Sequence, residues 1–307
     1  VAINDIGDPE TLVHLFRYDS VMGRFPHKVS YADGEIQIEG KDSITLVQER
    51  ALSNLPWESS NVDIVIESTG VFRKRAQLEQ HLVAGAPKVL LTVPSKDPID
   101  ATIVLGVNED DLKPEHRLIS NASCTTNCLA PMAKVLHESF GIEHAMMTTV
   151  HAYTNDQRVL DAPHSDPYRG RAAAVNIIPT TTGAARATGQ VLPALKGKID
   201  GMAMRVPVPV GSVVDLVSVL KKEVTLEQVN AAFAEATKGS LKGIMEYNED
   251  PIVSADIVGN PHSSIVAARS NMILGGEGRM VKTISWYDNE YGYSCRVIDL
   301  LKKAAAK

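Results

Sequence analysis

Apolar runs that end in polar residues recur through the first part of the chain. Residues 1–5, 61–70 and 88–95 are such runs, and the pattern is typical of a buried parallel sheet whose polar strand ends face a ligand. Between them, residues 9–18 carry apolar side chains at helical spacing and predict a short helix. The alternation of strands and helices predicts an α/β domain with a doubly wound, Rossmann-type sheet.

Three more stretches of the first part predict strands. Residues 29–55 alternate between apolar and polar side chains, with Asp33-Gly34 as a hairpin turn. Residues 103–107 form another apolar run, and residues 117–121 form a short strand that ends in polar side chains. These stretches add to the strands expected of the first domain.

The second part of the chain has a different pattern. Long β-branched stretches are interrupted by few helices, which predicts an α+β domain with a mixed or antiparallel sheet. Strands are expected at 145–153, 204–208, 216–220, 265–268 and 282–288, and helices at 225–238 and 289–307.

Composition narrows the class of protein. A chain of 307 residues, 44% hydrophobic and 22% charged, is long enough for two domains and typical of soluble globular proteins. Its net charge of −6 argues against nonspecific nucleic-acid binding. The 3 cysteines do not form the disulfide framework of a secreted domain. Because neither a signal peptide nor a membrane-spanning apolar stretch is visible, we expect a cytoplasmic location and no membrane partner.

The segment 123–128 reads Ser-Cys-Thr-Thr-Asn-Cys and predicts the start of a helix, with Ser123 or Asn121 as N-cap. A thiol at Cys124 would face unpaired N–H groups and the positive end of the helix dipole, which favour the thiolate. Cys124 is therefore a candidate nucleophile, although a buried structural cysteine remains the alternative. Cys128, one turn later, is expected to pack. A zinc pair would need two further ligands nearby, so no metal is predicted.

His151 is the candidate partner of this thiol. It lies near the end of the strand predicted at 145–153, which follows the helix that begins at Cys124. A helix–strand unit can return the end of its strand to the start of its helix. His151 would then be a base beside the thiol, although lone histidines are more often satisfied core or surface residues.

These residues lie in motifs that resemble the glyceraldehyde-3-phosphate dehydrogenase family. Ser-Cys-Thr-Thr-Asn-Cys-Leu-Ala-Pro at 123–131 is similar to the active-site signature of the family, and His-Ala-Tyr-Thr-Asn-Asp-Gln at 151–157 is similar to its catalytic-histidine stretch. The resemblance continues at 176–185, 204–209 and 286–293, so it spans almost the whole chain.

The resemblance implies a phosphorylating aldehyde oxidation with NAD as cofactor. Cys124 would form a hemithioacetal and then a thioester with glyceraldehyde 3-phosphate, and His151 would pair with the thiolate and act as base. Inorganic phosphate would release the acyl group as 1,3-bisphosphoglycerate.

The cofactor-binding residues follow partly from position and partly from the resemblance. Asp5, at a strand end, is suited to accept hydrogen bonds from the adenosine ribose and to favour NAD over NADP. The resemblance adds a strand-end turn, a second strand end and two residues beside the nicotinamide: Ser68, Thr69, Gly70, Ser95, Asn289 and Tyr293. Asn289 can also serve as a helix cap.

Two anion sites are implied. The substrate phosphate is assigned to Thr154 and Arg205, and the attacking phosphate to Ser123, Thr125, Thr182 and Gly183. Arg169 is assigned to either site, with Arg171 competing in the alignment and Thr181 as the register alternative to Thr182. Arg205 has a plainer alternative, an ion pair with Asp215.

The resemblance also gives an organisation. We expect residues 1–123 and 289–307 to form the NAD-binding domain, residues 124–288 to form the catalytic domain, and four chains to form a homotetramer through the irregular segment 153–176. The sequence departs from the family at its start, where no G-x-G-x-x-G loop appears. A sheet without its first strand exposes two unpaired edges, so we expect the sequence to be incomplete.

Two rival functions remain. Erythrose-4-phosphate dehydrogenases share the cysteine and histidine motifs, and the phosphate dependence of turnover separates the two enzymes. A non-catalytic binding protein is the alternative from another class, supported only by the absent glycine loop.

Overall fold

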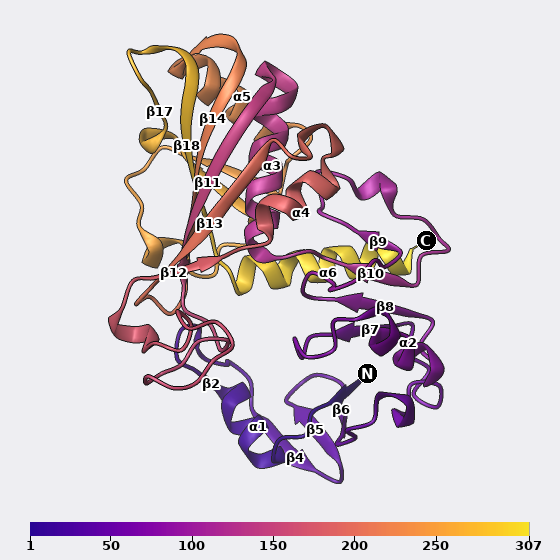
Figure 1. Ribbon diagram of the computed structural model, residues 1–307. Helices are drawn as coiled ribbons and strands as arrows, with labels where there is room; N and C mark the ends of the chain where they lie inside the picture. Colours follow the sequence, from indigo (N-terminus) through magenta and orange to yellow (C-terminus); the bar gives the residue numbers. More distant parts are fainter. Residues whose placement is uncertain (307) are drawn as a thin grey trace. The chain divides into compact units, whose positions relative to one another are not determined.

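The computed structural model describes residues 1–306, which form two compact units (Figure 1). The first unit contains Val1–Ala101 and Pro114–Ser120, and the second contains Thr102–Lys113 and Asn121–Ala304. Residues 102–113 and nearly all of the final helix therefore group with the second unit, whereas the NAD-binding domain expected above includes both.

The first unit contains small sheets and two helices. Its strands are β1 (Ala2–Asn4), β2 (Tyr18–Asp19), β3 (Gly23–Arg24), β4 (Val29–Ala32), β5 (Glu35–Ile38), β6 (Ile44–Val47), β7 (Ile64–Glu67), β8 (Lys88–Leu91), β9 (Ala101–Thr102) and β10 (Leu118–Ser120), and its helices are α1 (Pro9–Arg17) and α2 (Arg75–Val83). One sheet has the order β1-β6-β5-β4 and another the order β7-β8-β10-β9. β1 pairs with β6, and β8 with β7 and β10, in parallel, as expected of a Rossmann-type sheet.

β1 and β7 each lie at an edge of their sheet in the part of the chain that the structure describes. This arrangement confirms the expected pair of unpaired edges. Within β7, Ile66 is 37% exposed, whereas Val65 and Glu67 are buried.

Two predictions for local structure in this part have opposite outcomes. The hairpin turn at Asp33-Gly34 is confirmed, since both residues have positive φ angles, of 52° and 80°. The strand predicted at 103–107 is wrong, because the chain turns after Thr102. Asn108 holds that turn, with its amide donating to the Thr102 carbonyl and its oxygen accepting from the Val104 N–H.

The second unit is built on one sheet of eight strands. Its strands are β11 (Ile142–Ala152), β12 (Ile178–Thr181), β13 (Ile199–Val206), β14 (Ser212–Thr225), β15 (Met245–Asn248), β16 (Ser264–Ala267), β17 (Met272–Ile273) and β18 (Glu277–Tyr287). The order is β12-β13-β11-β14-β18-β16-β15, with β17 paired to β18. β11 runs parallel to β13 and antiparallel to β14, so the predicted mixed sheet is confirmed.

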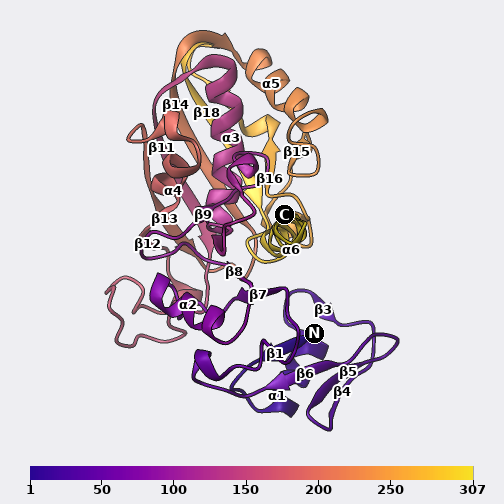
Figure 2. The same ribbon diagram turned by 90° about the vertical axis from the view of Figure 1, so that its right-hand side faces the viewer.

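Helices α3 (Cys124–Phe140), α4 (Ala184–Val191) and α5 (Leu226–Lys238) pack against this sheet, and α6 (Tyr291–Ala305) ends the chain (Figure 2). α3 is central to the core: Leu129, Met132 and Leu136 are fully buried, and each stabilises the fold by about 1.5–3 kcal/mol. The helix ends at Gly141, whose φ of 73° suits a residue without a β-carbon. Within residues 1–306, no helix is both long enough and apolar enough to cross a membrane.

The segment between β11 and β12 is irregular, as predicted. Residues 153–177 contain the short 3₁₀ turn Ala173–Val175 and an isolated bridge between Arg158 and Ala172, and the next strand begins at Ile178. The segment leaves several apolar side chains largely exposed, namely Val159, Leu160, Val175 and Ile177.

Candidate active site

Cys124 is the first residue of α3, in the position that the sequence predicted. Ser123 is the N-cap: its hydroxyl oxygen accepts a hydrogen bond of 3.1 Å from the Thr126 N–H. The Asn127 side-chain amide donates to the carbonyls of Ser123 and Asn121, which ties the turn to the helix. The thiol is therefore carried by a turn whose backbone is held at several points.

Ala122, two residues before the thiol, has a left-handed backbone with φ of 56° and is fully buried. Such a conformation costs a residue with a β-carbon about 1–3 kcal/mol and persists only where the surroundings hold it. The Tyr293 hydroxyl supplies one such constraint by donating to the Ala122 carbonyl at 3.0 Å. Tyr293, expected beside the nicotinamide, thus also steadies the turn that presents Cys124.

His151 lies beside this thiol, as the helix–strand argument predicted. Its Nε2 is 3.5 Å from Cys124 Sγ. β11 carries the histidine between β13 and β14, and the Tyr287 ring meets the imidazole edge-on with centroids 5.8 Å apart. The imidazole is 4% exposed and cannot swing freely into solvent.

The electrostatics differ from the expected thiolate–imidazolium pair. Burial raises the pKa of the Cys124 thiol above its ordinary value, although the Arg205 charge and the first N–H groups of α3 oppose the shift. Burial, together with the charge of Arg205, lowers the pKa of His151 to about 3. The helix start alone suggested a thiolate, but desolvation outweighs the dipole here, and the structure favours a neutral thiol beside a neutral imidazole.

Arg205 is the charged residue closest to this pair. On β13 it stands opposite His151 in the strand register, and its Nη1 is 2.9 Å from both His151 Nδ1 and the Ala152 carbonyl and 3.4 Å from Thr154 Oγ1. Burial lowers its pKa. The alternative partner Asp215 pairs with Lys282 at 2.7 Å instead.

Within residues 1–306 no carboxylate forms an ion pair with Arg205, and its Nε has no hydrogen-bond partner. A partly buried guanidinium without a carboxylate partner attracts an anion strongly. This side chain is therefore suited to bind a phosphate, and Thr154 lies on the same side of it.

Arg169 and Arg171 differ clearly in their surroundings. The Arg169 side chain is 16% exposed, forms ion pairs with Asp156 and Asp166, and donates to the Thr181 carbonyl. Its charge contributes to lowering the pKa of His151. Arg171 is 63% exposed and pairs with Asp161. Of the two arginines left open by the sequence, Arg169 is the one near the histidine.

The hydroxyls expected around the attacking phosphate already have partners. The Thr182 oxygen accepts from the Ala184 N–H at 3.2 Å, beside Gly183 at the start of α4. Thr125 Oγ1 is 2.8 Å from the Tyr287 hydroxyl, which also contacts Thr149.

Tyr287 was not identified from the sequence. Burial raises its pKa well above the ordinary value, so it stays a neutral phenol between two threonines and against the His151 ring. Its only signal was its place at the end of the strand predicted at 282–288, where a buried tyrosine reads as core.

Asn289 is fixed in a way that leaves one side of its amide available. Its Oδ1 accepts from the Gly211 N–H at 3.1 Å and from the Ser212 hydroxyl at 2.9 Å. The helix-cap alternative is wrong, because Asp288 Oδ1 accepts from the N–H groups of Glu290 and Tyr291 at the start of α6. Since Oδ1 is occupied, Asn289 can offer its Nδ2 donor to a carboxamide oxygen.

The remaining cofactor candidates lie in the first unit, at strand ends. Asp5 follows β1 and accepts from the Gly7 N–H at 2.8 Å. Ser68, Thr69 and Gly70 follow β7 as an exposed turn, in which Thr69 is bonded to Glu67. The Ser95 hydroxyl, beyond β8, donates to the Arg73 carbonyl at 3.0 Å.

The other cysteines do not extend this site. Cys128 is buried, with its sulfur near Ser264 and Ser285, and burial raises its pKa to about 12, in keeping with the expected packing role. No cluster of His, Cys, Asp or Glu suited to a metal ion occurs within residues 1–306.

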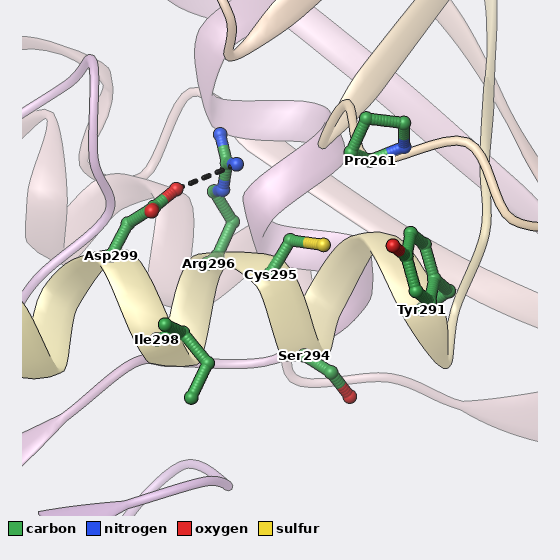
Figure 3. A pocket seen from close by; sticks show the side chains of 7 residues that line it. All are labelled: Pro261, Tyr291, Ser294, Cys295, Arg296, Ile298 and Asp299. Carbon is green, nitrogen blue, oxygen red and sulfur yellow. Dashed lines mark ion pairs between the residues drawn. The ribbon is translucent and has the colours of Figure 1, made fainter. Parts of the chain in front are cut away.

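A separate groove of about 430 Å³ lies along α6 (Figure 3). Its lining includes the third cysteine, Cys295, and none of the residues predicted for the active site. Its lining residues are Pro261, Tyr291, Ser294, Cys295, Arg296, Ile298 and Asp299.

Comparison with known proteins decides the family. Residues 123–289 match the family model for the C-terminal domain of glyceraldehyde 3-phosphate dehydrogenase, and residues 1–75 match the model for its NAD binding domain. The chain belongs to the glyceraldehyde-3-phosphate dehydrogenase family. The resemblance proposed from the motifs is confirmed, as is the combination of a Rossmann-type NAD-binding domain with a catalytic domain.

Similar members of the family come from several bacteria. Glyceraldehyde-3-phosphate dehydrogenase of Geobacillus stearothermophilus is 58% identical over 308 residues, which cover 100% of this chain and 91% of the relative. The Thermotoga maritima enzyme is 58% identical over 98% of this chain and 90% of its own length. Glyceraldehyde-3-phosphate dehydrogenase 2 of Streptomyces avermitilis is 57% identical over 98% of this chain and 89% of its own length. Cys124, His151 and Arg205 all fall within the matched C-terminal domain of the family.

Proposed function

We propose that the chain catalyses the NAD-dependent, phosphorylating oxidation of glyceraldehyde 3-phosphate to 1,3-bisphosphoglycerate. The observation that carries the proposal is the 3.5 Å approach of Cys124 Sγ to His151 Nε2 at the start of α3, in a chain of this family. The relatives described above bear the glyceraldehyde name, which supports this substrate over erythrose 4-phosphate. A nucleophile beside a base also argues against a protein that only binds.

Cys124 supplies the bond to the substrate. Its sulfur adds to the aldehyde carbon and the thiol proton passes to the aldehyde oxygen, which gives a hemithioacetal. His151 Nε2 then removes the hydroxyl proton as the carbon loses hydride and a thioester forms. Bound NAD supplies the acceptor for that hydride. An oxygen of inorganic phosphate then attacks the thioester carbon, the C–S bond breaks, and the thiolate of Cys124 is released.

The residues of the chain fit NAD. Asn289 holds its Oδ1 against Gly211 and Ser212, and this leaves Nδ2 to orient a carboxamide. Asp5 at the end of β1, the exposed turn Ser68-Thr69-Gly70 and Ser95 would hold the rest of the dinucleotide, with Tyr293 beside the nicotinamide.

Arg205 gives the resting site a way to become active when substrate binds. Two contacts of His151 Nδ1 favour different tautomers: Arg205 Nη1, at 2.9 Å, can only donate and favours a proton on Nε2, whereas the Ala152 carbonyl can only accept and favours a proton on Nδ1. A substrate phosphate that draws the guanidinium away lets Nδ1 hold a proton for the Ala152 carbonyl, 2.7 Å distant. Nε2 then has the lone pair that a general base needs.

The anion sites follow from the same geometry. Arg205 and Thr154 would bind the phosphate of the substrate. Arg169 would serve either anion. The attacking phosphate would use the residues at two helix starts, Ser123 and Thr125 on α3 and Thr182 and Gly183 before α4, where backbone N–H groups favour an anion.

The test is NADH formation from glyceraldehyde 3-phosphate, with and without inorganic phosphate. With phosphate we expect continuous turnover. Without it we expect one NADH per active site, since the thioester has no acceptor. Turnover that continues at the same rate without phosphate, or a higher kcat/KM for erythrose 4-phosphate, contradicts the proposal.

We also propose a cytoplasmic homotetramer, with residues 1–123 and 289–307 as the functional NAD-binding domain and 124–288 as the catalytic domain. The exposed apolar side chains Val159, Leu160 and Ile177 support self-association through the irregular segment. Light scattering of the purified protein should give four times the mass of its single chain. Replacing Val159 and Leu160 by serine should lower that mass. If the parent protein has the mass of a single chain, the tetramer is contradicted.

A further inference from the structure

A buried chain of hydrogen bonds connects Trp57 with the exposed turn after β7. The Trp57 indole N–H donates to His81 Nδ1 at 3.0 Å, and His81 Nε2 lies 3.1 Å from Glu67 Oε2. The other oxygen of Glu67 accepts from both the N–H and the hydroxyl of Thr69, at 2.8 and 2.5 Å. Trp57, His81 and Glu67 are only 5%, 3% and 3% exposed, so water does not replace these bonds.

For each of these hydrogen bonds, the chemistry of the groups determines which is the donor and which the acceptor. An indole N–H is only a donor, so His81 Nδ1 must accept and the proton of the neutral ring must be on Nε2. Nε2–H then donates to the Glu67 carboxylate, which is a pure acceptor when ionised. Burial opposes ionisation of Glu67, but the bonds from His81 and Thr69 outweigh it and leave its pKa below the ordinary value.

Glu67 takes both donors of Thr69, and the Thr69 hydroxyl oxygen in turn accepts from the Val71 N–H at 3.1 Å. The turn therefore has a fixed shape, completed by Gly70 with φ of 70°.

We propose that Glu67 is a positioning residue that preorganises the Ser68-Thr69-Gly70 turn for the cofactor, with His81 and Trp57 holding its carboxylate in place. The inference rests on the proposed function, because that function is what makes the turn a contact of NAD. A turn that is already ordered does not lose conformational entropy when the cofactor binds, and affinity rises accordingly.

The first test is Glu67→Gln in the full chain. The amide nitrogen that replaces one oxygen faces the His81 N–H or the Thr69 donors, so at least one of these donors loses its acceptor. We expect the dissociation constant of NAD to rise about 10-fold, the effect of one such unsatisfied group. The KM for glyceraldehyde 3-phosphate and kcat at saturating NAD should stay unchanged. The exposed Glu58→Gln is the matched control and should leave all three constants unaltered.

A graded series at His81 separates positioning from simple loss of a side chain. His81→Gln can place an amide donor near the Nε2 position and should retain much of the affinity for NAD. His81→Phe fills the space without supplying a hydrogen-bond donor and should weaken the binding of NAD as much as Glu67→Gln does. If the two variants have equal dissociation constants for NAD, the role of His81 in holding the Glu67 carboxylate is contradicted.

Trp57 provides a readout that does not depend on NAD. In a Trp286→Phe background Trp57 is the sole indole, since the chain has 2 tryptophans. Glu67→Gln should shift its emission in the absence of any ligand, and a folded variant with unchanged emission contradicts the coupling.

The outcomes distinguish this inference from the proposed function. If the parent binds NAD and a folded Glu67→Gln variant binds it equally well, the positioning role alone is overturned. If the parent does not bind NAD, the proposed function and the positioning role are overturned together. Melting temperatures of parent and variants establish which of them are folded.

Discussion

His81 and His151 are both almost fully buried, with 3% and 4% of their surface exposed, and each has close partners at both ring nitrogens. His81 lies between an indole that can only donate and a carboxylate that accepts. His151 lies between a thiol that can do either, a carbonyl that accepts and a guanidinium that donates. One set of partners permits a single protonation state, whereas the other permits two. Burial alone therefore does not mark a histidine as structural; the choice left open by its partners marks it as able to move a proton.

The largest effect should come from removing the Cys124 thiol, because it is a group with which His151, unlike His81, can exchange a proton. Cys124→Ser should lower kcat by about 10⁴-fold or more, because serine is a far weaker nucleophile beside a neutral imidazole. NADH formation measures the loss. NAD binding should be almost unchanged, and Cys295→Ser on α6 is the matched control that should keep parental activity. A serine variant with the parental rate refutes the nucleophile assignment.

The two histidines themselves give the next test. His151→Asn should lower kcat by about 10²–10⁴-fold, since general base catalysis is lost. His81→Gln should leave kcat nearly unchanged and lower the affinity for NAD only slightly. Steady-state kinetics with NAD and substrate varied in turn separate the two results. Comparable losses of kcat at both positions would contradict the view that His151 moves a proton in the reaction and His81 does not.

Arg205 is the donor near His151 that, beside the accepting Ala152 carbonyl, allows this histidine two protonation states. Arg205→Gln should raise the KM for glyceraldehyde 3-phosphate about 100-fold, the effect of losing a partly buried charge-assisted contact. It should also raise the pKa of His151, because one cause of its depression is gone. Alkylation of Cys124 as a function of pH reports this change. An unaltered alkylation profile would show that the arginine does not act on the histidine.

The pKa of His151 also predicts a pH dependence of stability. The folded protein keeps this residue neutral down to pH about 3, whereas the unfolded chain binds a proton below its ordinary value of about 6.5. The unfolded state thus holds more protons in this window, so stability falls as pH falls. Between pH 7 and 5 the loss should be about 2 kcal/mol, and His151→Asn should remove that part of the slope. Urea denaturation at both pH values measures it.

The smallest effect concerns the two arginines of the irregular segment. Arg169→Ala should lower kcat/KM for inorganic phosphate about 10-fold, because the variant loses a half-buried cation near the site. Arg171→Ala, its matched control, removes an exposed ion pair and should change kcat/KM by less than about 2-fold. Equal losses at both positions would argue against the assignment to Arg169.

Short-range patterns predicted much of the framework. The Ser123 cap, the α3 stripe and the β-branched run of β11 are local signals, and together they brought Cys124 and His151 into contact. Motif similarity supplied the family. The strand predicted at 103–107 failed because an apolar run records burial, and the turn held by Asn108 is buried as well.

Other features depend on contacts between distant residues and had no local signal. The neutral state of Cys124 and His151 results from desolvation by the surrounding core and from Arg205, 54 positions after the histidine. Tyr287 looked like an ordinary core residue. Glu67 looked like the polar end of a strand, and only the fold showed that His81 lies against it.

The left-handed backbone at Ala122 sets the sequence tolerance of the turn before the thiol. Valine, isoleucine and threonine are branched at the β-carbon and fit that conformation worst, and asparagine, which fits it well, would bring an unpaired amide into a fully buried position. A library randomised at residue 122 and selected for folded protein should therefore return glycine and alanine. Glycine should be the more stable of the two by about 1 kcal/mol. At this position the range of permitted residues is decided by the main chain, although the nearest chemistry belongs to a side chain two residues away.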